Sequence, residues 1–507
     1  MSINPIPIQF PAITRRTLLR GAAALAASTV LPGCGSKGGS TTSTTPPATN
    51  SQPIPAGSIV PLPLTVTATS AGSISPAFAG LSYEKSSLTE RLFTSSNTNL
   101  IGLFQRLGPS VLRVGGNSVD KNVWTPAGPG QISGQIAPGD VASLAAFVKA
   151  ACWQCLYGIN LGGAATGANT PALAASEVEY AYQQFGSSLL GVEIGNECDL
   201  YGNAGNYYAG AWSYSDFLAL WGQYRTAILA TTPKVSMTGP ADASNVSSWT
   251  IPFGQTVTKS EITLLTQHYY RANGQSPTST VQLLITPDPT LVSEVATLQA
   301  GAKGIGIPWR MAECNSFYNG GAPGVTDSYA SSLWVVDFLF DCALGGAIGV
   351  NFHGGGNGTG YTPIADSNGT VVQARPEYYG MLLFTLAGQG TLYTTQLSTG
   401  GLNATAYAVK TATGLNLILV NKDSTDNVQV TIQLPTAIAS ATLLEMTQLS
   451  AGASAPNLSA TDGVTIQGAS VGINGSFAPP VGYTLDPSGT QLTCYVPSLS
   501  AVLIQTT

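Results

Sequence analysis

The stretch Gly191–Glu197 reads Gly-Val-Glu-Ile-Gly-Asn-Glu and joins a short apolar run to a polar end. Leu190–Ile194 has the residue types of a buried β-strand, and the carboxylate of Glu197 follows that strand closely. A second stretch of the same kind, Trp309–Glu313, also ends on a glutamate. Parallel strands that carry polar residues at their carboxyl ends are typical of barrel enzymes, whose sites form at one rim.

Six further β-type runs lie between residues 77 and 390, and longer helical patterns separate most of the runs. This alternation predicts an α/β fold with a parallel sheet, and eight strands are the number that a (β/α)₈ TIM barrel needs. The predicted strands are Ala77–Ser82, Val111–Val114, Leu156–Leu161, Leu190–Ile194, Val235–Thr238, Ile262–His268, Trp309–Glu313 and Ile348–His353.

The helical patterns between the strands carry start and stop signals. The helix between the fifth and sixth strands is poorly marked. The marked helices are Val141–Ala151 with Asp140 as cap, Tyr214–Ala230, Ser328–Ala343 after Asp327, and a helix from Pro376 to near Gly388.

After Gly390 the pattern changes to short strands between Gly, Asn, Asp and Pro turns, which predicts a β-sandwich that supports the barrel. The early strand Leu62–Ala68 has no helix after it, so we expect it to join the sandwich. The predicted barrel covers residues 73–388, and the sandwich covers residues 58–72 with 389–507. The predicted sandwich strands are Leu402–Lys410, Leu415–Val420, Val428–Leu434, Ala441–Met446 and Ser500–Gln505.

The N-terminal residues 1–34 have the pattern of a twin-arginine export signal of the lipoprotein type. Arg15 and Arg16 precede an apolar run, Gly21–Leu31, which is too short to span a bilayer. Cys34 then stands where a lipidated first residue is expected; the alternative is an ordinary cleaved signal with an unrelated cysteine. Residues 35–57 are predicted to be a flexible Ser/Thr/Pro/Gly linker. We therefore expect an exported periplasmic or cell-surface protein that meets the membrane only through this lipid.

The composition restricts the partners of the chain. Only 9% of the 507 residues are charged, and a formal net charge of −6 offers no basic surface for nucleic acid. His268 and His353 are the two histidines and no Cys/Asp cluster has ligand spacing, so we predict no metal and no cofactor. Cys152 and Cys155 form a lone C-x-x-C, which is either a local disulfide or two buried thiols.

The two strand-end glutamates carry the predicted chemistry. A lone glutamate at a strand end is usually a helix cap or a solvated charge, but two at one barrel rim match the pair that cleaves glycosidic bonds. Cleavage with retention needs two carboxyl groups about 5 Å apart, one protonated and one ionised. Asn196 is placed to hydrogen-bond the sugar 2-hydroxyl. Arg113, inside the second strand, is expected to support the carboxylates from below.

Several motifs together resemble glycoside hydrolase family 79, which contains β-glucuronidases and heparanase. The resemblance runs from about Leu64 to the C-terminus and implies that Glu197 is the acid/base and Glu313 the nucleophile. Tyr270 matches a tyrosine that hydrogen-bonds the nucleophile. The motifs are Leu112–Asn117, Glu193 with Asn196 and Glu197, His268–Tyr270, and Glu313 with Tyr318 and Gly320–Pro323.

The resemblance also implies how the substrate is held. In the family, backbone amides after the nucleophile and a tyrosine beyond the eighth strand bind a uronate carboxylate; the matching positions are Asn319, Gly320 and Tyr361. Glu84 and Asn117 match positions that bind sugar hydroxyls. The remaining positions of interest are His268, expected to contact substrate; His353, either a substrate contact or a plain strand-end histidine; and Cys198 and Asn319, where relatives carry Pro and Gly.

Three functions remain open from the sequence. The first is a retaining hydrolase that releases β-linked glucuronic acid, or a related uronate, from glycosides or polysaccharides. The second is a hydrolase of the same barrel clan that acts on a neutral sugar, such as a xylosidase or arabinofuranosidase. The third is a non-catalytic, sugar-binding lipoprotein. The retained pair of glutamates favours the first two, because sugar binding alone does not need that pair.

Overall fold

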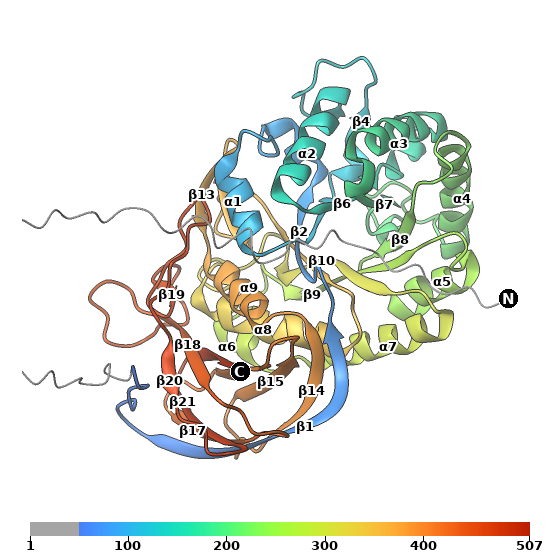
Figure 1. The fold of residues 1–507 in the computed structure, drawn as a ribbon. Helices are drawn as coiled ribbons and strands as arrows, with labels where there is room; N and C mark the ends of the chain where they lie inside the picture. Colours follow the sequence, from blue (N-terminus) through green and yellow to red (C-terminus); the bar gives the residue numbers. More distant parts are fainter. Residues whose placement is uncertain (1–49) are drawn as a thin grey trace, which may run out of the picture. The chain divides into compact units, whose positions relative to one another are not determined.

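Eight parallel strands close into a barrel in the computed structural model, which describes residues 50–507 (Figure 1). Each predicted barrel strand overlaps an observed one, so the predicted (β/α)₈ fold class is confirmed. In barrel order the strands are β10 (Trp309–Tyr318), β11 (Val350–Gly354), β2 (Ala79–Glu84), β3 (Val111–Gly115), β6 (Gln154–Ile159), β7 (Leu189–Ile194), β8 (Met237–Asp242) and β9 (Leu264–Asn273).

Burial on both faces explains why these strands are readable from the sequence. Every residue of β3 is buried, because one face points into the barrel and helices cover the other. β9 and β10 extend beyond the predicted ends, and their pairing continues to Asn273 and Tyr318. The extra residues of β9 are only partly buried, whereas those of β10 are buried up to Phe317 but include the polar Asn315 and Ser316. Both extensions therefore lack the continuous apolar run of a buried strand.

Helices surround the barrel (Figure 1). Asp140 was expected to precede α2 but lies in its first turn, because Pro138 begins the helix; its carboxylate accepts the backbone N–H of Ala137 at 2.9 Å. The poorly marked helix exists as α5, after a π-helical turn at Val246–Thr250. The helices are α1 (Thr98–Arg106), α2 (Pro138–Ala151), α3 (Pro171–Phe185), α4 (Tyr214–Thr231), α5 (Ile251–Val257), α6 (Val281–Ile285), α7 (Pro289–Ile305), α8 (Tyr329–Leu344) and α9 (Pro376–Ala387).

The second sheet has ten strands and curls around its own apolar core, which includes Leu64, Leu419 and Ile504 (Figure 1). β1 (Ile59–Ile74) joins it, antiparallel to β14 and parallel to β17. The other strands are β14 (Gly390–Leu397), β15 (Ala404–Lys410), β16 (Leu415–Asn421), β17 (Asn427–Gln433), β18 (Ala441–Gln448), β19 (Val464–Ile466), β20 (Tyr483–Leu485), β21 (Gln491–Val496) and β22 (Ser500–Thr506).

Aromatic and polar contacts join this sheet to the barrel helices. The rings of Phe340 in α8 and Tyr407 in β15 stack at 4.1 Å, and the hydroxyl of Tyr329 donates to the carbonyl of Leu499 at 2.7 Å. Lys422 forms an ion pair with Asp337 of α8. The described residues, 50–507, form one compact unit, so the boundary predicted at residue 388 stays a prediction.

The start of the described chain corrects the linker prediction. The side chain of Asn50 donates to the carbonyl of Val481, and that of Gln52 donates to the carbonyl of Tyr495 at 2.7 Å. These polar side chains satisfy backbone groups of the sheet, so residues 50–52 do not belong to a free linker. The predicted signal and Cys34 lie outside the described residues.

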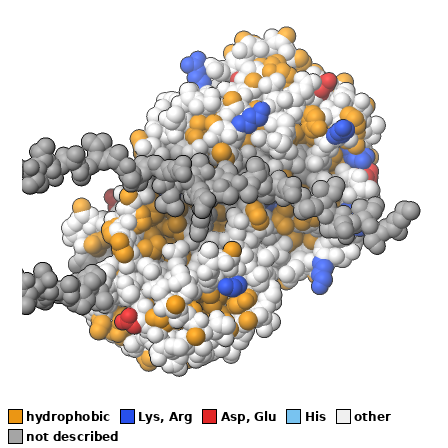
Figure 2. Space-filling model, viewed as in Figure 1, with side chains coloured by type: hydrophobic (Ala, Val, Ile, Leu, Met, Phe, Trp, Pro, Cys, Tyr) orange, Lys and Arg blue, Asp and Glu red, His pale blue; other side chains and the backbone are white. Residues whose placement is uncertain are grey.

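The described cysteines are all free, so the disulfide alternative for Cys152 and Cys155 is wrong. Cys155 is fully buried in β6, whereas Cys152 ends α2 in a left-handed conformation and is exposed. Within residues 50–507, no helix has the length and apolar character needed to cross a membrane. On the face shown in Figure 2, the Lys and Arg side chains lie apart from one another on a mostly neutral surface.

Candidate active site

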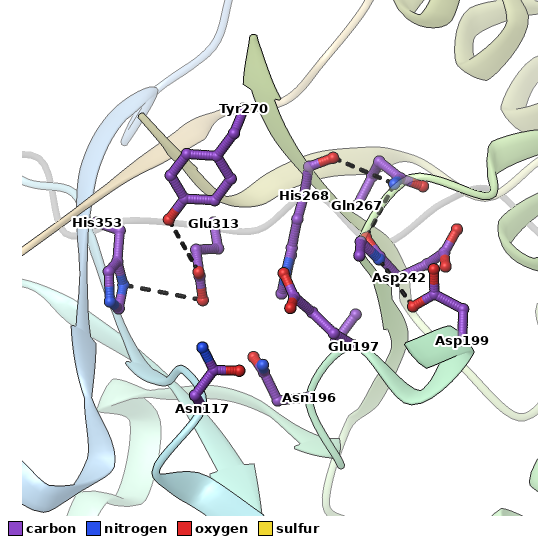
Figure 3. Close-up of polar contacts among 12 residues, drawn as sticks. Asn117, Asn196, Glu197, Asp199, Asp242, Gln267, His268, Tyr270, Glu313 and His353 are labelled. Carbon is purple, nitrogen blue, oxygen red and sulfur yellow. Dashed lines mark hydrogen bonds and ion pairs between the residues drawn. The ribbon is translucent and has the colours of Figure 1, made fainter. Parts of the chain in front are cut away.

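The two predicted glutamates meet at the carboxyl-terminal rim of the barrel (Figure 3). A carboxylate oxygen of Glu197, one of Glu313 and a ring nitrogen of His268 all lie within 4.8 Å of one another. Glu197 follows β7 and Glu313 lies in β10. The barrel therefore brings together two acids that are far apart in the chain, because parallel strands end at the same rim.

The backbone aims Glu197 at this rim by an unusual conformation. Its φ and ψ are both 48°, in the left-handed region, and its backbone N–H donates to the carbonyl of Ala241 at 2.8 Å. The ring nitrogen Nδ1 of His268 lies 3.2 Å from Oε1 of Glu197. The side chain of Glu197 is 18% exposed, so a substrate can reach it.

Glu313 is the more enclosed of the two acids, with a side chain only 7% exposed. An extra residue in β10, between Met311 and Glu313, shifts the register with β9; such bulges re-aim side chains next to active sites. The hydroxyl of Tyr270 donates to Oε1 of Glu313 at 2.9 Å, and a guanidinium N–H of Arg113 donates to Oε2 at 2.5 Å. Both oxygens are therefore held in place.

Arg113 holds Glu313 directly and contacts Asn196, the residue before Glu197, from inside the barrel. Its guanidinium is fully buried and also donates to Glu193 at 2.7 Å and to the side-chain carbonyl of Asn196 at 2.8 Å. Because that carbonyl accepts from Arg113, the amide N–H₂ of Asn196 remains available for a substrate. Asn117 and Asn196 both extend toward the two glutamates in Figure 3.

The surroundings of Glu313 favour its ionised form. Burial alone raises the pKa of a carboxyl group, but the positive charges of His353, His268 and Arg113 act in the opposite direction. The hydrogen bond from Tyr270 lowers the pKa further. The net result is a pKa well below the ordinary value, so Glu313 is a carboxylate at neutral pH.

His353 lies between two carboxylates and is not a plain strand-end residue. Its Nε2 is 3.7 Å from Glu84, and its Nδ1 is 3.8 Å from Glu313 and 3.1 Å from the hydroxyl of Ser82. Burial lowers the pKa of this imidazole, but the charges of Glu313 and Glu84 outweigh burial and raise it. Burial also raises the pKa of Glu84, and the contacts with His353 and Ser118 lower it overall.

Close backbone contacts place the predicted uronate-binding positions together. Asn319 and Gly320 are exposed, in left-handed conformations after β10, and the carbonyl of Gly320 lies so near Gly360 that a side chain at 360 has no room. Tyr361 follows, with its ring centre 5.7 Å from that of Tyr270. Burial and the charge of Glu313 raise the pKa of Tyr361, so its phenol stays a neutral donor.

The donor set beside Glu197 does not suit a metal ion. His268, Glu197 and Glu313 are close enough to meet one cation, but both oxygens of Glu313 already accept from Tyr270 and Arg113. The guanidinium of Arg113 also repels a second positive charge there. The sequence prediction of a site without metal stays a prediction.

Three acids near the rim were not found from the sequence: the buried Asp120 and Asp242 and the partly buried Asp199. Asp120 accepts the backbone N–H of Leu161 and Gly162 and the hydroxyl of Tyr201 at 2.5 Å. Each of the three stands in a loop or at a strand end without any periodic pattern around it. Other polar residues of the rim were predicted from the resemblance to a known family. The motifs that carry this resemblance do not include the three acids.

The comparisons with known proteins agree with this geometry. No protein-family model matches the chain. A protein of Aspergillus niger named beta-glucuronidase is 27% identical over 278 residues, which cover 48% of this chain and 50% of that protein. One of Neurospora crassa with the same name is 25% identical over 60% of this chain and 62% of that protein. The resemblance to β-glucuronidases is confirmed. The matched segments span only about half to three fifths of these relatives.

Solved structures share the fold at low sequence identity. A 4-O-α-L-rhamnosyl-β-D-glucuronidase from Fusarium oxysporum superposes with a TM-score of 0.71 at 18% identity, covering 88% of this chain and 100% of that one. An α-L-arabinofuranosidase from Thermotoga maritima gives 0.62 at 15% identity over 87% of this chain and 99% of its own. The barrel with its appended sheet is therefore an architecture found in glycoside hydrolases.

The position of His353 predicts its charge. We expect the pKa of its imidazole to lie above the ordinary value of 6.5. Glu313→Gln is expected to lower this pKa, because a negative charge that stabilises the protonated ring is lost. A ¹⁵N NMR titration measures both, since the 507-residue sequence contains two histidines and therefore gives only two pairs of imidazole nitrogen signals. Glu261→Gln, which removes an acid paired with Arg225 instead, is the control that leaves the titration unchanged. A wild-type His353 that loses its proton below pH 6.5 contradicts the prediction.

Proposed function

We propose that the chain is a retaining glycoside hydrolase that releases β-linked glucuronic acid, or a related uronate, from glycosides or polysaccharides. The observation that carries the proposal is the approach of Glu197 and Glu313 to within 4.8 Å. Retaining enzymes hold their two carboxyl groups about 5 Å apart, whereas inverting enzymes separate them by roughly 6.5–9.5 Å to admit a water. The spacing therefore supports double displacement.

In the first step, an oxygen of Glu313 attacks the anomeric carbon of the sugar while the glycosidic bond breaks. Glu197 gives its proton to the departing oxygen, so the leaving group departs as a neutral alcohol. Arg113 and Tyr270, which hold both oxygens of Glu313, keep the nucleophile ionised and in line. The amide of Asn196 is placed to bind the sugar 2-hydroxyl, a contact that strengthens in the transition state.

In the second step, the ionised Glu197 takes a proton from a water molecule, whose oxygen attacks the same carbon. The bond to Glu313 breaks, Glu313 returns as a carboxylate and Glu197 is again protonated. His268, 3.2 Å from Glu197, faces this proton transfer. Two attacks on opposite faces leave the sugar with its original configuration.

The uronate preference rests on neutral donors beside the nucleophile. The phenol of Tyr361 and the backbone amides at Asn319 and Gly320 offer hydrogen bonds to a carboxylate without a bound cation of their own. Glu84 and Asn117 are the proposed partners of sugar hydroxyls. Asn319, at a position where a relative carries glycine, is proposed to narrow the space for the uronate. The two fungal relatives named beta-glucuronidase support this choice of sugar.

Substitution of the two glutamates separates their roles. Glu313→Gln is expected to lower kcat by more than about 10³-fold on every substrate, because the nucleophile is lost. Glu197→Ala is expected to cost about 10²–10⁴-fold on an alkyl β-glucuronide, which needs a proton donor. The same substitution is expected to lower kcat far less on a dinitrophenyl β-glucuronide, because that leaving group needs no proton. Equal losses on the two leaving groups count against the acid role, and no wild-type turnover of any aryl glycoside favours the non-catalytic alternative.

Tyr361→Phe tests the choice between a uronic and a neutral sugar. Loss of one hydrogen bond to a charged group costs about 1.5–3 kcal/mol, which is roughly 10- to 100-fold in kcat/KM. We expect this loss on an aryl β-glucuronide and little change on an aryl β-xyloside. Tyr318→Phe, an exposed tyrosine at the end of β10, is the matched control. A wild type that prefers the xyloside, or an equal loss on both sugars, supports the neutral-sugar alternative.

The N-terminal sequence supports a further part of the proposal: export and attachment of a lipid at Cys34. This lipid is proposed as the only membrane contact of the protein. Mass spectrometry of the mature N-terminus is expected to find a lipidated Cys34, and Cys34→Ser to release the protein into the soluble fraction. A mature chain that starts elsewhere with unmodified residues overturns this part alone.

A further inference from the structure

Two acids, the partly buried Asp199 and the buried Asp242, lie side by side near Glu197 (Figure 3). Asp199 belongs to the 3₁₀ turn at Cys198–Leu200, which follows Glu197 directly, and Asp242 is the last residue of β8. Asp242 is only 1% exposed. The two carboxyl groups are within hydrogen-bonding reach of each other, although the ends of two different barrel strands carry them.

The hydrogen bonds around the pair leave one place for a proton. Asp199 accepts the backbone N–H of Ala243 at 3.0 Å and the amide of Asn245 at 2.7 Å. The single O–H of Thr250 is directed to Gln267 at 2.6 Å and leaves only a weak contact with Oδ2 of Asp242 at 3.3 Å. The buried Oδ1 of Asp242 has no partner among the described residues. Ionised carboxylates can only accept, so two of them repel each other. One proton between the acids removes the repulsion and gives both a hydrogen bond.

The electrostatic surroundings agree with this hydrogen bond. Burial, together with the hydrogen bond and charge of Asp199, raises the pKa of Asp242 to about 10. The side chains that hydrogen-bond to the two residues, those of Asn245, Thr250 and Gln267, carry no charge. Asp199 is the charged group that acts on Asp242, and the Cys198 thiol is the titratable group next to Asp199 on the same turn.

The pair is connected to Glu197 on both sides of its strained backbone. The N–H of Glu197 donates to the carbonyl of Ala241, the extra residue of a bulge in β8 directly before Asp242. Asp199 stands two residues after Glu197 and is tied to the loop after β8 through Ala243. Thr250 donates to Gln267 at 2.6 Å, and Gln267 precedes His268, the contact of Glu197.

We propose that Asp199 and Asp242 share one proton and are positioning residues that hold Glu197 where it can protonate the leaving group. This inference rests on the proposed function for the role of Glu197, but not for the proton itself. The shared proton ties the turn after Glu197 to the end of β8, so the left-handed conformation of Glu197 is held from both flanks. Loss of the hydrogen bond releases the acid/base residue while the nucleophile, held by Arg113 and Tyr270, stays in place.

Proton uptake on folding tests the shared proton without any substrate. Because the pKa of Asp242 is raised in the folded protein, the folded state keeps a proton that the unfolded chain loses above about pH 4. Stability therefore falls as pH rises toward 10. Asp242→Asn keeps a hydrogen-bond donor to Asp199 but cannot titrate. Urea unfolding of the full chain between pH 6 and 9 measures the unfolding equilibrium constant. For each pH unit, this constant is expected to rise by about tenfold more in the wild type than in Asp242→Asn.

Kinetics on two leaving groups test the positioning role. Asp242→Asn is expected to keep kcat/KM on an alkyl β-glucuronide within about threefold of wild type, because its amide replaces the shared proton. Asp242→Ala and Asp199→Ala are expected to lose more than about tenfold on that substrate, yet little on a dinitrophenyl β-glucuronide. A structural role alone would lower both activities together.

The outcomes separate this inference from the proposed function. Equal pH slopes for wild type and Asp242→Asn overturn the shared proton. Equal losses on both leaving groups in the alanine variants overturn the positioning role. A further outcome is a wild type that cleaves no β-glucuronide while its unfolding constant still depends on pH more steeply than that of Asp242→Asn. In that case the proposed function and the positioning role are wrong, but the shared proton of Asp199 and Asp242 is supported.

Discussion

The guanidinium of Arg113 is the interaction on which the site depends. From the middle of β3 it contacts Glu193 and Asn196 on the β7 side and Glu313 on β10, with its own side chain fully buried. Removing one partner from a buried ion pair is strongly destabilising, because the remaining charge has no solvent. Without Arg113, the carboxylates of Glu193 and Glu313 would face each other uncompensated in the barrel, and protons would neutralise them. The same cation therefore fixes the position of Glu313 and favours its ionised form.

Two identical side chains acquire different roles from their surroundings. Glu313 is tied at both oxygens by a cation and a phenol, so it is fixed and ionised. Glu197 is more exposed, and among the described residues its side chain contacts only His268. It can therefore exchange a proton with a substrate or a water. Environments that push apart the proton affinities of two neighbouring acids are the general means by which one site supplies both a nucleophile and an acid.

The sequence predicted most of the barrel because its strands are buried on both faces and read as short apolar runs. The same logic predicted the meeting of Glu197 and Glu313, since parallel strands end at one rim. β14 was missed because it alternates polar and partly buried residues, and β21 because polar residues interrupt it. The pairing of Asp199 with Asp242 depends on how the ends of two strands bend, at a left-handed turn and at a bulge. No spacing along the chain encodes such a contact.

The stereochemistry of hydrolysis tests the central claim most directly. Under the proposed function, the approach of Glu197 and Glu313 to within 4.8 Å predicts cleavage through a bond to the protein and not by direct attack of a water. ¹H NMR of the first sugar released from an aryl β-glucuronide, recorded before the anomers equilibrate, distinguishes the outcomes. Our account predicts that β-glucuronic acid appears first. If α-glucuronic acid appears first, water attacks directly and the account is wrong.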